Sequence, residues 1–269
     1  KNLKAYSSLN SITIVTMGLG MTMLFFLGIL SFNINKELNT SIPKSAPDYF
    51  FLGIQKNELN LFSEQIRKID YEAKQIVVPL ISARIEAIND KDPMELIDKK
   101  NKSFWFINGE RRISWAKVPP ANNPVVEGKW WEEDERNELK LSIDQKVAKD
   151  LRLKIGDSMT FNIYGNSVSG IIMNFRKVDY RDLNINFAIL FNPKYASKIP
   201  HEFLSAVKFK HDKLVNFSNL ITTLPTITYI KLSDYINKTR NFLNKLFIAS
   251  ILISGIVIFI GLIVISNAV

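Results

Sequence analysis

Two long stretches without a charged side chain limit what this chain can fold into. One lies between Lys4 and Lys36, and the other runs from Leu246 to Val269. About 20 apolar residues at 1.5 Å each cross the roughly 30 Å hydrocarbon core of a bilayer. Both stretches reach that length, and both are apolar all round, unlike a helix that buries one side in a globular core. The sequence therefore predicts two membrane-spanning helices.

The segments next to these stretches predict how the chain is placed. Residues 1–10 form a weakly basic lead-in, which favours the cytoplasmic side. No helix breaker directly follows the first apolar stretch, so 11–42 predicts a transmembrane helix that continues as a stalk. Ser233 is a candidate N-cap, so 233–269 predicts a second stalk and transmembrane helix. Residues 43–232 are then expected in the periplasm, as part of a multi-pass inner-membrane protein whose true N-terminus lies elsewhere.

The middle region shows the same order of strand and helix patterns twice. Strand patterns alternate between apolar and polar residues, and helix patterns repeat apolar residues at spacings of three and four. The two strand-helix-strand sets are 48–54, 57–69, 75–88, 203–210, 212–224 and 226–232. Two β-α-β units predict a ferredoxin-like α+β core formed by 43–99 and 199–232.

Residues 100–198 predict an inserted subdomain made mostly of strands. Ser142 and Gln145 have capping-box spacing and predict the start of a short helix. A hairpin follows, in which Gly165-Asn166 suits a two-residue turn, and a strand at 187–193 ends at a proline. The complete prediction is an α+β extracytoplasmic domain with this insertion, carried on two transmembrane helices with helical stalks.

Motifs for catalysis or cofactor binding are absent from the sequence. It contains no G-x-x-x-x-G-K-[ST] loop, no G-x-S-x-G elbow, no H-E-x-x-H helix and no cysteine. His201 and His211 have no carboxylate at ligand spacing, and the acidic run at 127–135 is typical of a solvated face. We therefore predict no catalytic, cofactor-binding or metal-binding residues. The net charge of +9 comes from scattered lysines, which does not favour nucleic-acid binding.

Trp130 and Trp131 are the candidates for a partner or ligand surface. Adjacent residues on a strand point to opposite faces. One indole is then expected in the core, and the other is a candidate for contacting a partner or a lipid-like ligand. Packing of both in the core is the favoured alternative, because Trp is largely buried on average.

Several segments resemble one family of transporter subunits. They are "NNPVVEGKWW", "LKIGDSMTF", "RKVDY", "NINFAILFNP" and the tail that begins with "LPTITYIKLSDYI". Together they resemble the YbbP-type permease subunits of FtsX-like, MacB-type ABC transporters, in the second of two halves. One departure is Ala188, where a second aromatic residue is expected.

The resemblance implies a role in ATP-driven work at the membrane. A separate cytoplasmic ATPase and the rest of the permease would be partners, and stalk helices would transmit motion to a periplasmic domain that handles lipids or other hydrophobic molecules. The chain itself would be neither an enzyme nor a cofactor-binding protein. Two alternatives stay open: a two-span sensor with an extracytoplasmic domain, and an FtsX-like regulator of a periplasmic hydrolase.

Overall fold

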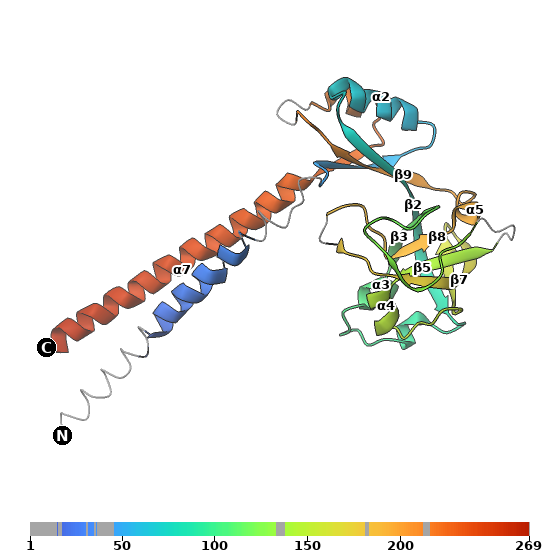
Figure 1. The fold of residues 1–269 in the computed structure, drawn as a ribbon. Helices are drawn as coiled ribbons and strands as arrows, with labels where there is room; N and C mark the ends of the chain where they lie inside the picture. Colours follow the sequence, from blue (N-terminus) through green and yellow to red (C-terminus); the bar gives the residue numbers. More distant parts are fainter. Residues whose placement is uncertain are drawn as a thin grey trace. The chain divides into compact units, whose positions relative to one another are not determined.

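The computed structural model describes residues 15, 18–30, 32–34, 36, 46–132, 138–180, 183–211 and 216–268. The chain divides into two units (Figure 1). We call Lys1–Lys44 with Leu232–Val269 the helical unit, and Ser45–Lys231 the sheet unit. The lead-in predicted at 1–10 lies outside the described residues.

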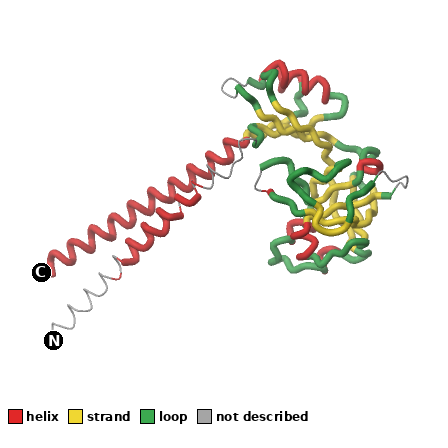
Figure 2. The backbone as a smooth tube through the Cα atoms, in the orientation of Figure 1, coloured by secondary structure: helices red, strands yellow, loops and turns green. Residues whose placement is uncertain are grey.

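The helical unit contains two helices that lie side by side. Residues 18–30 are helical, and α7 covers Leu232–Ala268. A Cβ built on Gly28 would lie 3.9 Å from the Phe247 ring, so the two helices are in close contact at this position. Figure 2 shows both helices running along one another.

The predicted fold class is wrong, because it required two transmembrane helices. Within the part of the chain that the structure describes, no helix combines the length and the apolar character needed to cross a bilayer.

Two β-α-β units interleave in one part of the sheet unit. The strand order is β10-β1-β9-β2, and neighbouring strands are antiparallel. The elements are β1 (Tyr49–Ile54), α2 (Leu59–Ile69), β2 (Lys74–Ile88), β9 (Glu202–Lys208), α6 (Ser218–Thr223) and β10 (Thr228–Lys231). The strands of each unit are parallel, with a strand of the other unit between them, which is the ferredoxin-like arrangement. The strand patterns and the helix pattern of α2 are confirmed here. The helix predicted over 212–224 is shorter, because 216–217 are not helical, and 212–215 lie outside the described residues.

Helices α2 and α6 cover one face of these four strands (Figure 1). Phe62 and Ile66 of α2 and Leu220 of α6 are at most 1% exposed, and they pack with Phe51 and Val207 of the sheet. The rings of Phe51 and Phe62 meet edge to face, with centroids 5.1 Å apart. This core explains the helical pattern of α2, because its apolar stripe faces the sheet.

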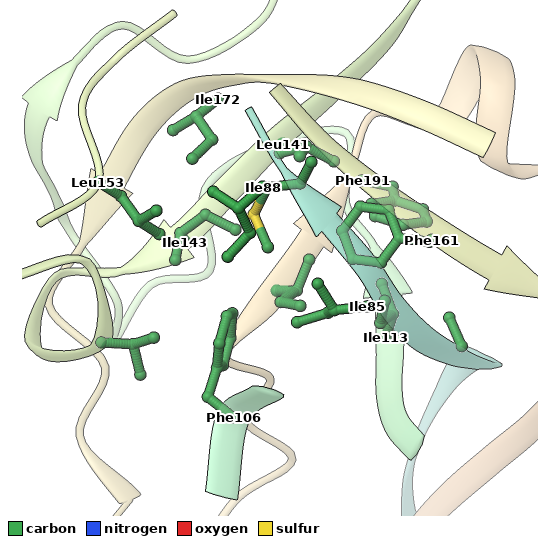
Figure 3. Packing of buried hydrophobic residues seen from close by; sticks show 14 of the residues in the cluster. Ile85, Ile88, Phe106, Ile113, Leu141, Ile143, Leu153, Phe161, Ile172 and Phe191 are labelled. Atoms are coloured by element: carbon green, nitrogen blue, oxygen red, sulfur yellow. The ribbon is translucent and has the colours of Figure 1, made fainter. Parts of the chain in front are cut away.

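Most of the remaining strands of the sheet unit form a closed ring with part of β2, and β4 pairs with β7 outside this ring. Pairings run from β2 to β3, β8, β5, β7 and β6, and β6 pairs again with β2. The elements of this part are η1 (Pro93–Glu95), α3 (Phe104–Ile107), β3 (Glu110–Trp115), β4 (Val125–Gly128), β5 (Leu139–Asp144), α4 (Gln145–Asp150), β6 (Ser158–Ile163), β7 (Asn166–Arg176), β8 (Ile189–Phe191) and α5 (Pro193–Ala196). Figure 3 shows Ile85, Leu141, Phe161 and Phe191 converging from four strands into its apolar core.

The β6–β7 hairpin turns one residue earlier than predicted. Ile163 pairs with Asn166, so the two-residue loop is Tyr164-Gly165. Both loop residues have positive φ, 52° and 87°, as a primed hairpin turn requires. A tyrosine occupies the first of these positions, where the prediction looked for glycine.

The start of α4 also differs from the prediction. Its N-cap is Asp144, whose carboxylate accepts a hydrogen bond from the backbone N–H of Lys146. Ser142, the predicted cap, is fully buried in β5. The capping-box spacing therefore coincided with a buried strand residue that has another role.

Strand β2 belongs to both parts of the sheet. Residues 74–80 pair with β9, 81–84 with β3, and 84–88 with β6, apart from an irregularity near residue 86. The boundary predicted between 43–99 and 100–198 stays a prediction. Before residue 99, however, β2 already runs from the ferredoxin-like strands into the ring.

Asp70 links the turn after α2 to the end of β9. Its carboxylate is 5% exposed and accepts backbone hydrogen bonds from Glu72 (3.0 Å), Lys210 (2.7 Å) and His211 (3.1 Å). Burial opposes ionisation, but these donors outweigh it and lower the pKa of Asp70. The ionised carboxylate therefore stabilises the folded state.

We predict that Asp70→Asn lowers stability at pH 7 and flattens its loss in acid. The contribution of Asp70 is present above the unfolded pKa of about 3.9 and is lost as the pH falls through the lower folded value. Urea unfolding from pH 7 to pH 3 measures this. Asp90→Asn is the control, because Asp90 is exposed and its φ of 60° also suits Asn. An acid decline as steep in Asp70→Asn as in the unaltered protein would contradict the prediction.

Candidate ligand or partner surface

The tryptophan pair follows the end of strand β4. Gly128 ends that strand with φ of 81°. A Cβ there would lie 2.8 Å from Ile155 Cδ1 and closer still to the Met173 carbonyl oxygen, so only glycine fits. Trp130 and Trp131 therefore lie beyond the strand. Their rings stack with centroids 4.0 Å apart and planes at 35°, instead of pointing to opposite faces of a strand.

Both indoles are anchored to the segment after β3. Trp130 Nε1 donates to the Lys117 carbonyl and Trp131 Nε1 to the Ala116 carbonyl, each at 2.9 Å. Buried indole N–H groups need such acceptors. Two adjacent tryptophans thus bind two adjacent carbonyls, which fixes the segment 129–132 against the chain near 116.

The two tryptophans differ in burial. Trp131 is 7% exposed and packs with Leu80, Phe187 and Leu190. Trp130 is half-buried at the edge of this cluster, which we call the tryptophan cluster. One ring is therefore a core residue, and the other retains surface that a ligand or partner can contact.

An apolar sheet face lies next to the tryptophan cluster. Phe50 pairs with Ala206 and Ile230, and Ala206 pairs with Ile76, so these side chains share the face opposite helices α2 and α6. The residues of this open face are Phe50, Leu52, Ile76, Val78, Leu204, Ala206, Thr228 and Ile230. Ile76 is 56% exposed and Ile230 is 37% exposed. Val78 and Leu204 also pack against the tryptophan cluster, so the two are continuous.

A buried guanidinium lies behind this surface. Arg176, the last residue of β7, is fully buried. Its Nε donates to Ser142 Oγ at 2.7 Å, and its Nη2 donates to the Phe187 carbonyl at 3.0 Å. Nη1 has no hydrogen-bond partner among the described residues. Burial lowers the pKa of Arg176 to about 10, which leaves it charged at neutral pH.

The Asp144 carboxylate is a negative charge near Arg176, and the Tyr180 hydroxyl is its hydrogen-bond partner. The Tyr180 hydroxyl donates to Asp144 Oδ2 at 3.1 Å. Burial and the Asp144 carboxylate raise the pKa of Tyr180, so the hydroxyl remains a donor. The carboxylate also opposes the fall in the pKa of Arg176. Strand β5, helix α4 and the segment after β7 therefore meet at one polar centre.

Arg176, Ser142 and Asn174 were not among the site residues predicted from the sequence. The signal was present in part, because "RKVDY" and "NINFAILFNP" carry Arg176, Tyr180 and Phe187, and they were among the segments that resembled a family. Their convergence depends on pairings between distant strands, which local patterns do not give.

Other polar side chains of the described residues lie in a separate cleft. This cleft of about 790 Å³ is lined by mixed charges that include Arg84, Glu86 and Asp92. Within the described residues, no group of three or more His, Asp or Glu side chains is arranged to hold a metal. His201 packs edge to face on Trp115 at 4.6 Å. Part of the acidic run at 127–135 lies outside the described residues.

Comparison with known proteins identifies a relative among membrane transporter subunits. No family model matches the chain. A curated relative is an ABC transporter permease, so the resemblance noted in the sequence is confirmed. That relative is "Uncharacterized ABC transporter permease YbbP" of Escherichia coli (strain K12), 25% identical over 222 residues. The match covers 79% of this chain and 25% of the relative, so the chain spans about a quarter of the relative's length.

We predict that Trp131→Ala destabilises the protein by about 3–5 kcal/mol, since it empties a packed position. Trp130→Ala should cost clearly less, because that ring is half-buried. Denaturant unfolding of the intact protein measures both changes. Equal losses would show that the two rings are equally part of the core.

Proposed function

We propose that this chain is part of the permease subunit of an ABC transporter, and that its sheet unit handles a lipid-like or other hydrophobic molecule. The similarity to an ABC transporter permease supports the proposed class of protein. The open face supports the kind of substrate, because exposed contiguous apolar surface marks interaction sites. ABC transport places the whole permease at the plasma membrane, with 43–232 facing the periplasm in this proposal.

ATP hydrolysis is assigned to a separate partner. The sequence has no P-loop to hold nucleotide phosphates, and we propose that the chain is not itself an enzyme. A cytoplasmic ATPase subunit and the rest of the permease are the proposed partners. The relative's class favours this function over the two-span sensor. Regulation of a periplasmic hydrolase stays a hypothesis that co-purification of such a hydrolase would support.

Helix α7 is the proposed route for ATP-driven motion. Strand β10 ends at Lys231 and α7 begins at Leu232, so no loop residue separates them. A continuous helix transmits displacement better than a flexible linker, which would decouple its ends. The edge strand of the ferredoxin-like part is therefore followed directly in the chain by the longest helix among the described residues.

We predict that Ile76→Glu weakens binding of a hydrophobic probe to the intact protein about tenfold, or 1.4 kcal/mol. A carboxylate on the open face would have to be desolvated under the probe. Titration with a fluorescent fatty acid measures the affinity.

Ile171→Glu is the matched control for the open face. Ile171 is 45% exposed on β7, on the ring and away from the open face. Neither exposed substitution should alter stability by more than about 0.5 kcal/mol. Equal probe affinities in the two variants would contradict the assignment of the open face.

We predict that Leu243→Pro in the complete transporter abolishes the stimulation of ATPase activity by substrate, while the ATPase still co-purifies. Proline inside a helix costs about 3 kcal/mol or more and breaks it. Leu243→Ala keeps the helix and serves as control. Full stimulation in Leu243→Pro would exclude α7 as the coupling element.

A further inference from the structure

We propose that Arg176, Ser142 and Asn174 are positioning residues that set the place of the tryptophan pair. The pair's role as a ligand surface rests on the proposed function, but its positioning does not. All three residues are fully buried. They act on Trp130 and Trp131 through hydrogen bonds to the backbone.

The first branch leads from the guanidinium to the residue before Trp130. Arg176 Nε donates to Ser142 Oγ, which in turn donates to Asn174 Oδ1. Asn174 Nδ2 then donates to the Lys129 carbonyl at 3.1 Å. Each group has its donor and acceptor roles fixed by its neighbour, so the direction of the Asn174 amide follows from the charge on Arg176.

The second branch leads to the partner of Trp131. Arg176 Nη2 donates to the Phe187 carbonyl, and the Phe187 side chain is 9% exposed within the tryptophan cluster. One guanidinium thus holds backbone on both sides of the cluster. A planar, rigid fork of donors suits this task better than a lysine.

Burial makes this arrangement rigid. An unsatisfied buried donor or acceptor costs about 1–3 kcal/mol, so movement of the Lys129 carbonyl away from Asn174 is penalised. The indole bonds to Lys117 and Ala116 hold the same segment from its other side. Trp130 is consequently fixed at the edge of the tryptophan cluster, which continues into the open face, before any ligand arrives. This lowers the entropy cost of binding.

The test measures the geometry of the two indoles directly. Two indoles stacked 4.0 Å apart give an exciton couplet in circular dichroism, which Trp130→Phe removes and so isolates. Asn174→Asp is nearly isosteric: it still accepts from Ser142 but no longer donates to Lys129. Ser142→Ala cuts the same branch one step earlier. Ser205→Ala is the matched control, because Ser205 is also a fully buried strand serine, and its hydroxyl has no partner among the described residues.

We expect the couplet to fall to the Trp130→Phe level in Asn174→Asp and Ser142→Ala, and to persist in Ser205→Ala. An intact couplet in either folded variant overturns the proposal. Failure of both variants to fold also overturns it, because the side chains would then support the whole unit and not the pair. A lost couplet with unchanged fatty-acid affinity would leave the positioning role standing and count against the proposed function.

Discussion

Strand β2 is the constraint on which the rest of the sheet unit depends. Its first half pairs with β9 in the ferredoxin-like part, and its second half pairs with β3 and β6 in the ring. Because one backbone serves both, the register of either part restricts the other. The tryptophan cluster lies at this point of β2, since Leu80 packs with Trp131. Val78 packs against the same cluster and is also part of the open face.

The polar centre adds a second level of specificity. Removing Arg176 would leave the Phe187 carbonyl and the Ser142 hydroxyl without their donor in a dry interior. A hydrophobic core would tolerate several packings of the segment 129–132, whereas a satisfied polar network favours one. The half-buried Trp130 therefore inherits its position from residues that never reach the surface. Buried residues thus fix the position of Trp130, and Trp130 provides the contact surface. A preformed ligand surface requires this arrangement.

The relation to an ABC transporter permease and the architecture bear on different questions. The relation gives the class, over 79% of this chain and about a quarter of the relative. The architecture identifies a surface that the class alone does not indicate. The membrane-helix prediction was drawn from two long, uncharged and apolar stretches. It is wrong for the described residues, among which no helix meets the length and hydropathy that a membrane span requires.

The sequence by itself determined the local elements. Aromatic residues predicted β1, and strand patterns predicted β2, β9 and β10. The three-four spacing of apolar residues predicted α2, and the order of these elements predicted two β-α-β units. These patterns are local, because each records which side of one element meets the core. Only the tertiary structure decided the hairpin loop at Tyr164-Gly165, the burial of Ser142, and the meeting of Arg176, Asn174 and Phe187 behind the tryptophans. Those depend on register and on hydrogen bonds between strands far apart in the chain, which no local period of residues encodes.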